Sequence, residues 1–361
     1  MKKKIDWGYL LSLFLALTLA LALGGVIMAL AGHNPFRAYG ELVKGATGLK
    51  SFGEIGKIFT KRQFGNTLEY AMVLYLTGLA CAIGARVGIF NVGGEGQLYL
   101  GAIVSGYLGV VLTDLPAFIV IPVAALGAMV VGGFYAFIPG VLKVKLKVNE
   151  VITTIMMNSI AIFLCAYLSS GPWKTSHPNR VSGTDTLAQN LQFDKLIPGS
   201  NLTTAIFASA VIAFLVWYIM GKTTKGYEMR LVGENPRFAK FAGLKVDRTI
   251  IGSMVVSGML CGLVGMFEVY GLKGNYQDGI SKEYYFDGLL VAMIMRYKPA
   301  GIIAMSFLFA FLKVGAAGME LNAGVPGELY RIIQSIIIFF LAAESGVKQL
   351  LRARKAGAAH E

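Results

Sequence analysis

The chain has 361 residues, of which 55% are hydrophobic and only 15% charged, and its mean hydropathy is +0.63. Soluble domains carry about 25% charged residues, and one soluble core cannot bury this much apolar surface, so an ordinary soluble protein is excluded. The net charge of +13 would suggest nucleic-acid binding in a soluble protein, but these basic residues flank apolar runs, so we predict contact with membrane lipid and no nucleic-acid partner.

The chain begins with the basic segment Met1–Lys4, which is followed by an apolar run over residues 9–31. This run is longer than the core of a secretory signal peptide, which has about 7–15 residues, and no small-residue cleavage site follows it. We therefore predict a retained first helix whose N-terminus is cytoplasmic.

Apolar windows continue along the whole chain, and a spanning helix needs about 20 mostly apolar residues. In chain order, the windows cover residues 9–31, 70–85, 96–113, 115–142, 151–173, 202–221, 249–267, 284–295, 299–319 and 332–343. They predict an all-α integral membrane protein with about ten transmembrane helices, some short or re-entrant. We expect a single transmembrane domain over residues 1–361 with both termini in the cytoplasm.

The basic residues suggest how the loops are placed, because cytoplasmic loops carry an excess of lysine and arginine. Residues 222–248 hold seven basic and three acidic side chains, and they are predicted to form a cytoplasmic loop. Residues 344–361 are predicted to form a cytoplasmic tail, and residues 32–66 and 171–201 extracytoplasmic loops. Residues 32–66 fit this rule poorly, because they contain six basic side chains.

The residues that commonly carry chemistry show no catalytic or metal-binding pattern. Cys81, Cys165 and Cys261 all lie in apolar stretches, which indicates small buried side chains, and the three histidines are scattered. Gly221-Lys222-Thr223 resembles the end of a phosphate-binding loop, but Val216 occupies the position of the required upstream glycine. We therefore predict that the chain is not an enzyme, holds no metal and binds no nucleotide itself.

A polar, glycine-rich stretch lies between the second and third apolar windows, at residues 86–97. Its glycines and its polar side chains Asn91, Glu95 and Gln97 would break a helix that faces lipid. Irregular backbone at membrane depth occurs only where protein buries it or where it lines a watery cavity, and acids there are usually functional. Two interpretations of Glu95 remain open: a buried functional acid, or a solvated cytoplasmic turn.

Four stretches together resemble the permeases of the branched-chain amino acid, ribose and nucleoside importer superfamily, and the nucleoside and simple-sugar branch most of all. They occur in the family's order. The stretches are residues 88–97 with Leu100-Gly101-Ala102, residues 149–158, residues 224–236 with Ala239 and Ala242-Gly243, and Phe286-Asp287-Gly288.

The third stretch can also be interpreted from its residues. Asn235 can cap a helix and Pro236 suits its first position, which predicts a short basic, amphipathic helix. Such a helix could lie among lipid headgroups. The resemblance instead implies a coupling helix that docks on an ATPase. The residues it implicates are Gly226, Arg230, Gly233, Glu234, Asn235, Pro236 and the anchors Phe238 and Phe241.

The second and fourth stretches supply further candidates for a substrate pathway. Glu150 lies near a helix N-terminus, where a structural role is the simpler interpretation, and Asn158 is expected to bond a neighbouring helix or contact substrate. Phe286 and Asp287 fit helix packing, gating or ligand contact equally. The segment 289–296 is bulkier than the family's small-residue run, which leaves the size of the substrate cavity open.

The resemblance implies the permease subunit of an ATP-binding-cassette importer for nucleosides or simple sugars in the bacterial cytoplasmic membrane. Its implied partners are a cytoplasmic ATPase that binds ATP and magnesium, a second permease subunit or a copy of this chain, and an extracytoplasmic solute-binding lipoprotein. Asn91, Glu95 and Gln97 would line the route of the substrate. The alternative is an ion-coupled secondary transporter of a small polar solute, with Glu95, Glu268 or Asp287 as the coupling acid.

Overall fold

The computed structural model describes residues 7–49, 52–177 and 182–340. Within these ranges the chain is built from helices, and one isolated β-bridge joins Lys195 to Thr203. The predicted all-α class is confirmed. The basic segment Met1–Lys4 and the predicted tail 344–361 lie outside the described residues.

As far as the described residues extend, each predicted apolar window coincides with a helix, but fewer of these helices are long enough to cross a membrane unaided. By length and composition, six described helices qualify, or seven if a bent pair counts as one span. The six are α3 (Arg62–Arg86), α5 (Ala117–Leu146), α6 (Glu150–Ser170), α7 (Ala205–Lys222), α10 with its continuation η3 (Val246–Lys273) and α12 (Pro299–Ala323). The other windows correspond to the bent pair α1 (Trp7–Leu30) and α2 (Pro35–Thr47), to α4 (Gly94–Val111), to α11 (Tyr284–Ile294) and to Leu329–Phe340.

The chain divides into two compact units, and the first contains residues 1–67 and 309–361. Here α2 turns away from α1 by 120°, directly after Asn34, whose side chain accepts hydrogen bonds from the backbone N–H groups of Phe36 and Arg37. Gly45 of α2 packs so closely on Gly318 of α12 that a Cβ would come within 2.8 Å of its Cα. The segment 32–66, predicted as a loop, is therefore mostly helical, with α2 and the 3₁₀ helix η1 (Phe52–Thr60).

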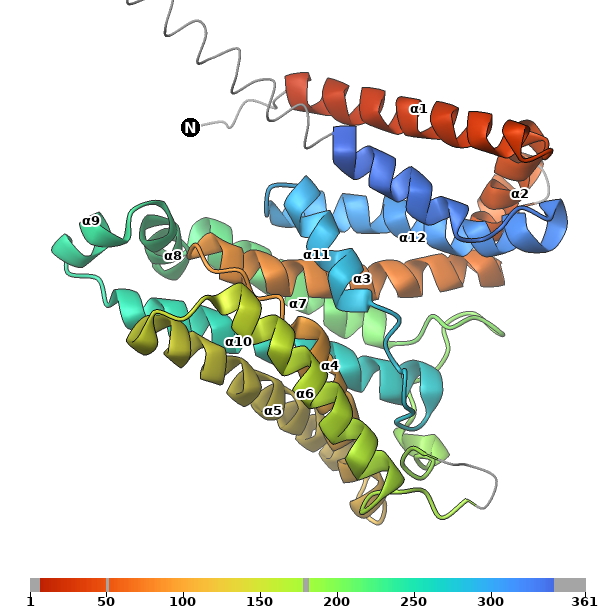
Figure 1. Cartoon of the computed structure of the whole chain (residues 1–361). Helices are drawn as coiled ribbons and strands as arrows, with labels where there is room; N and C mark the ends of the chain where they lie inside the picture. Colours follow the sequence, from red (N-terminus) through yellow and green to blue (C-terminus); the bar gives the residue numbers. More distant parts are fainter. Residues whose placement is uncertain (1–6, 50–51, 178–181, 341–361) are drawn as a thin grey trace, which may run out of the picture. The chain divides into compact units, whose positions relative to one another are not determined.

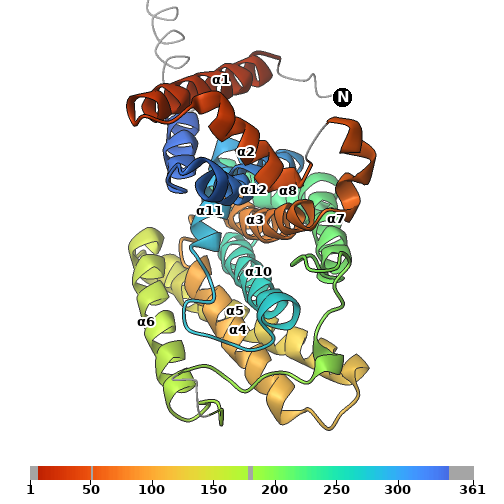
Figure 2. The ribbon, with the colours of Figure 1, turned by 90° about the vertical axis from the view of Figure 1, so that its right-hand side faces the viewer.

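The second unit, residues 68–308, is organised around the packing of α10 against α4 and α5 (Figures 1 and 2). Gly258, Gly262 and Gly265 on α10 allow this close packing. A Cβ at any of the three would lie within 3.0 Å of a backbone oxygen on the facing helix: Gly258 on Gly132, Gly262 on Ala128 and Gly265 on Leu98. Only small residues allow membrane helices to approach this closely.

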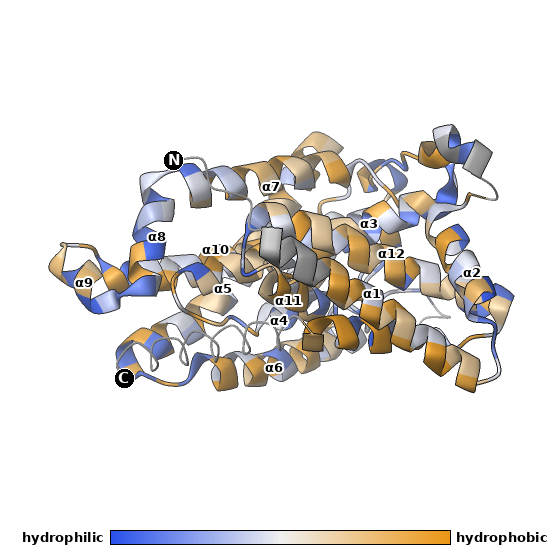
Figure 3. Ribbon diagram, turned by 90° about the horizontal axis from the view of Figure 1, so that it is seen from above, coloured by the Kyte–Doolittle hydropathy of each residue, from blue (hydrophilic) through white to orange (hydrophobic). Residues whose placement is uncertain are grey.

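The helices of the second unit differ in how much of their surface protein covers. In α10 and η3, 67% of the most apolar window is buried, whereas α5, α6 and α7 each bury 28% of theirs. The uncovered surface of these three helices is apolar, as the orange ribbon of α7 shows in Figure 3, while α8 (Thr224–Glu234) is more hydrophilic. Surfaces of this kind suit lipid or another membrane helix.

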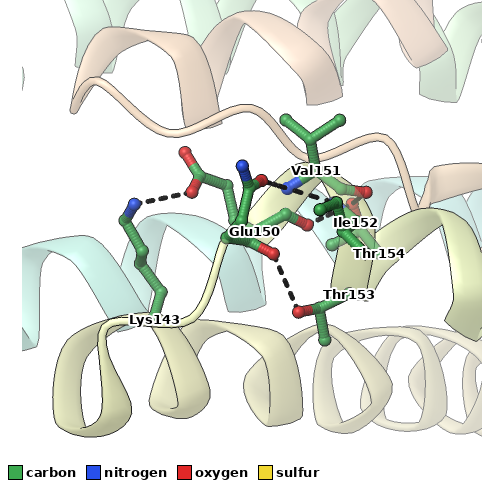
Figure 4. A network of polar contacts seen from close by, with 7 residues as sticks. Lys143, Glu150, Val151, Ile152, Thr153 and Thr154 are labelled. Carbon is green, nitrogen blue, oxygen red and sulfur yellow. Dashed lines mark hydrogen bonds and ion pairs between the residues drawn. The ribbon is translucent and has the colours of Figure 1, made fainter.

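The start of α6 is fixed by local polar contacts, and Glu150 has the structural role predicted for it. The Asn149 side chain accepts a hydrogen bond from the N–H of Val151 at 2.9 Å, and Lys143 pairs with the Glu150 carboxylate at 2.7 Å (Figure 4). The hydroxyl of Thr153 donates to the Asn149 carbonyl at 2.9 Å. Glu150 thus has a structural role at the junction of α5 and α6.

Candidate functional site

The candidate site begins where α3 ends at Arg86 and the chain runs without helix to the start of α4 at Gly94. Asn91 and Gln97 are fully buried, and Glu95 is only 5% exposed. Residues 91–93 and the first turn of α4 are therefore enclosed by protein, as expected for membrane depth. The interpretation of Glu95 as a solvated turn is wrong.

We call the non-helical run 87–93 together with the first turn of α4 the polar junction. Both the nitrogen and the oxygen of the Asn91 side-chain amide form hydrogen bonds that stabilise it. Its Nδ2 donates to Oε1 of Gln97 at 3.1 Å and to the hydroxyl of Ser257 on α10 at 2.9 Å. Its Oδ1 accepts from the N–H of Gly93 at 3.0 Å and from Nε2 of Gln97 at 3.3 Å. Asn91 and Gln97 thus link the non-helical run to the first turns of α4.

Two side chains of α6 satisfy the backbone of the same junction. Asn158 accepts a hydrogen bond from the N–H of Gly96 at 2.8 Å and donates to the carbonyl of Val92 at 2.9 Å. The hydroxyl of Thr154 accepts from the N–H of Val92 at 3.2 Å. Buried backbone groups without partners are costly, so these contacts stabilise the irregular segment. The expected hydrogen bond from Asn158 to a neighbouring segment is confirmed.

Tyr285 of α11 closes the junction from the other side. Its N–H donates to Oε2 of Glu95 at 3.0 Å, and its hydroxyl donates to the carbonyl of Asn91. Its ring lies against Gly94, where a Cβ would approach ring carbons to well under 3.0 Å. The fully buried ring therefore requires glycine at the first position of α4.

The predicted coupling residues form two short helices, α8 and α9 (Pro236–Phe241). As predicted, Asn235 caps α9 by accepting from the N–H of Phe238 at 3.0 Å, and Pro236 is its first residue. Ala239 is buried, whereas Phe238 is 55% and Phe241 is 92% exposed. The short helix is therefore anchored on one face and presents two aromatic rings on the other.

The remaining coupling residues lie along α8 and at its ends. A Cβ on Gly226 would lie within 3.0 Å of the carbonyl oxygens of Ile219 and Met220, so glycine allows the tight turn from α7 into α8. Arg230 is half-buried, and Glu234, the last residue of α8, is exposed.

Gly233 joins α8 to the polar junction. A Cβ at Gly233 would lie within 3.0 Å of the Arg86 carbonyl oxygen and 3.2 Å from the Gly88 nitrogen. Around this contact, Val87 and Ile89 share one hydrophobic cluster with Val232, Ala239 and Met254. The two motifs that the sequence singled out separately are thus in direct contact.

The profile of the family described as branched-chain amino acid transport system / permease component matches residues 63–342. The chain belongs to this family. The permease is 34% identical over 359 residues to the guanosine ABC transporter permease protein NupP of Bacillus subtilis, covering 97% of this chain and 98% of the relative. The resemblance inferred from the sequence motifs is confirmed.

Two further relatives cover most of the permease. The nucleoside ABC transporter permease protein NupB of Lactococcus lactis is 33% identical over 355 residues, which are 96% of this chain and 94% of the relative. The glucose ABC transporter permease protein TsgB13 of Haloferax volcanii is 32% identical over 349 residues, 91% of this chain and 86% of the relative. No solved structure matches the permease. Family and apolar helices together identify a multi-pass membrane protein.

The predicted pathway residues of the permease fall into two groups. Asn91, Glu95, Gln97 and Asn158 meet at the start of α4, and every hydrogen bond given above joins them to protein groups. The next two residues of α11 after Tyr285 have other surroundings: Phe286 is 37% exposed, and Asp287 accepts from the hydroxyl of Tyr70 at 3.0 Å. Their roles in substrate passage stay predictions.

Sequence reasoning named Glu268 as a possible coupling acid but missed its neighbour Glu69. Glu69 on α3 is 7% exposed and Glu268, the first residue of the π-helical η3, is 1% exposed, and their carboxyl groups lie within hydrogen-bonding reach of each other. Glu69 directly precedes the second apolar window, and this position could have indicated an acid at membrane depth.

Cys81, Cys165 and Cys261 are free and buried, as predicted. In the part of the chain that the structure describes, no group of three or more metal-ligating side chains is close enough to hold an ion.

Proposed function

We propose that the permease is the membrane subunit of an ATP-binding-cassette importer for nucleosides or simple sugars in the bacterial cytoplasmic membrane. The observation that carries this proposal is the similarity, over nearly the whole chain, to permeases named for guanosine, nucleosides and glucose. ATP and magnesium bind to a partner ATPase, so this chain performs no chemistry of its own. A second permease subunit or a copy of this chain completes the transporter, and a solute-binding lipoprotein delivers the solute from outside.

The ATPase docks on α8 and α9. Two observations support this placement: Phe238 and Phe241 are exposed on a helix whose opposite side is anchored by the buried Ala239, and α8 and α9 follow directly on the membrane span α7. Exposed aromatic side chains on a fixed helix are suitable anchors for a groove on a partner.

Movement of the ATPase reaches the interior of the permease through Gly233. Because Gly233 lies against the backbone of Arg86 and Gly88, a shift of α8 must displace the start of the polar junction. The cluster of Val87, Ile89, Val232, Ala239 and Met254 makes the two segments move together. ATP binding therefore favours one of two arrangements of the junction, and the ATPase supplies the difference in affinity between them.

The same junction controls the substrate route. In this structure Asn91, Glu95, Gln97 and Asn158 bond one another and the backbone, so they close the segment instead of offering free groups to a solute. Rearrangement of the junction would turn these amide and carboxyl groups toward the hydroxyl groups of a nucleoside or sugar. Phe286 and Asp287 line the route from α11.

Reconstitution of the complete transporter tests the proposed function. The permease, its ATPase, its second permease subunit and the solute-binding protein are placed in liposomes, and uptake of radiolabelled guanosine is measured. We expect uptake to require ATP hydrolysis and to persist when a protonophore is added. Competition by unlabelled glucose then distinguishes a sugar permease from a nucleoside permease. ATP-independent uptake that the protonophore abolishes would contradict the proposal and support the ion-coupled alternative.

Replacing both Phe238 and Phe241 with alanine should weaken ATPase binding at least roughly 30-fold, because aromatic anchors each contribute about 2 kcal/mol or more at an interface. The measurement is copurification of the ATPase with tagged permease, followed by titration of the purified subunits. Phe36→Ala is the matched control, since this ring is 90% exposed on α2, in a segment predicted to be extracytoplasmic. A double variant that retains full ATPase binding would show that these rings are not the anchors.

A further inference from the structure

A cavity of about 710 Å³ lies within the second unit, where α7 and α10 meet α8. Its walls are of two kinds. The apolar wall comes from α3, α7 and α10, with Ile83, Val216, Ile219, Met220 and Val256. The polar wall comes from α8 and the start of α10, with Lys225, Glu228, Lys245 and Arg248. The volume is within the range of roughly 300–1,000 Å³ that is typical of small-molecule sites.

The polar wall carries an excess of positive charge. Lys225 is paired with Glu228 at 2.8 Å, so its charge is compensated. Lys245 and Arg248 are exposed side chains, and neither has an ion-pair partner among the residues that the structure describes. Three basic groups against one carboxylate leave two positive charges at the edge of the cavity.

The two walls are arranged along the direction of the membrane spans. The apolar wall lies in the last turns of α7, which ends at Lys222, and in the first turns of α10, which begins at Val246. The basic groups lie near these ends: Lys225 in the first turn of α8, Lys245 directly before α10 and Arg248 in its first turn. An aliphatic surface that leads into a cationic rim matches an acyl chain attached to a phosphate. A nucleoside or sugar is uncharged and rich in hydroxyl groups, and it needs neither feature.

We propose that this cavity binds one anionic membrane phospholipid. The headgroup phosphate is held by Lys245 and Arg248, and an acyl chain lies against Val216, Ile219 and Val256. Basic pockets between membrane helices are suited to anionic headgroups, because each basic residue near the surface contributes about 1 kcal/mol of attraction. The bound lipid contacts α7, α8 and α10 together and so joins the docking helices to the spans. This inference does not depend on the transported solute.

Native mass spectrometry of the purified full-length permease tests this inference, with phosphatidylglycerol and phosphatidylcholine supplied in equal amounts. We expect wild-type permease to retain one phosphatidylglycerol and the Lys245→Gln, Arg248→Gln double variant to retain it roughly 10- to 30-fold more weakly. The control is Lys145→Gln with Lys147→Gln, which removes the same charge from the end of α5, outside the cavity lining. This control should retain the lipid as wild type does.

A second variant tests the apolar wall without changing charge. Gly252 lines the cavity, and a Cβ at this position would meet nothing within 4 Å, so Gly252→Phe should fill the space and exclude the acyl chain.

Equal retention of phosphatidylcholine by the wild type would overturn the proposal, and so would unchanged retention of phosphatidylglycerol by the double variant. Displacement of the lipid by millimolar inorganic phosphate would assign the basic rim to a free phosphate and overturn the lipid assignment. Displacement by the ATPase subunit would assign the cavity to a protein segment instead.

Discussion

Replacing Gly94 with alanine should lower the melting temperature of the permease by roughly 2–4 °C and reduce solute uptake at least about tenfold. The added methyl group would approach the ring of Tyr285 to well under 3.0 Å, and that ring is fully buried. Relief of this clash requires the ring to move, which breaks the bonds from Tyr285 to Glu95 and to the Asn91 carbonyl. Overpacking of this kind costs about 1–3 kcal/mol, and here it falls on the junction that we assign to the substrate route.

Gly40→Ala is the matched control for this experiment. Gly40 also lies inside a helix, α2, and a Cβ there would meet nothing within 4 Å. Alanine should therefore be neutral or slightly stabilising at this position. The double variant Gly94→Ala, Tyr285→Leu separates a clash from a general loss of stability, because its cost should be smaller than the sum of the two single costs. Additive costs would show that the ring contact is not the cause.

The sequence predicted those parts of the site that depend on neighbouring residues. Asn235 and Pro236 were expected to begin a helix, and Glu150 was expected near the start of another, and both helices begin there. A capping side chain accepts a hydrogen bond from a backbone group two or three residues away. The interaction therefore depends only on residues that are close together in the sequence. The same holds for the break between the second and third apolar windows, because glycine and polar residues end an apolar run wherever they occur; the structure confines the break to residues 87–93 and places Glu95 and Gln97 in α4.

The environment of Glu95 could not be decided in this way. Its partner Tyr285 lies 190 residues further along the chain, and Asn158 reaches Val92 across 66 residues. One sequence gives no information on which distant segments meet, so a buried acid and a solvated one look alike. The structure settles the matter by placing α6 and α11 on either side of the junction.

The segment 32–66 shows a different kind of failure. Its low hydropathy left it outside the apolar windows, so a loop was predicted, whereas residues 35–47 form α2. The helix was visible in its periodicity, because the buried residues Ala38, Leu42 and Ala46 recur every four positions. Hydropathy windows average over both faces of such a helix and so hide it. The spacing of apolar residues, together with Asn34 and Pro35, was the better signal.

Gly233→Ala should separate ATP hydrolysis from transport. The added methyl group would press on the backbone of Arg86 and Gly88, which cannot turn aside as a flexible side chain can. The end of α8 must then move away from the polar junction, while Phe238 and Phe241 on α9 remain exposed for docking. We expect uptake to fall roughly 10- to 100-fold, the usual range for loss of coupling between two sites, and the ATPase to remain bound and active.

Three measurements on one preparation decide the matter: copurification of the ATPase, its rate of ATP hydrolysis and uptake of the radiolabelled solute. Gly221→Ala is the control, because this glycine lies one residue before the end of α7 and a Cβ there would meet nothing within 4 Å. Normal uptake by Gly233→Ala would show that force does not pass through this contact. Loss of the ATPase from the complex would mean that Gly233 shapes the docking surface itself. Only hydrolysis without uptake fits a contact that transmits movement, because this result requires intact docking together with a junction that no longer follows the ATPase.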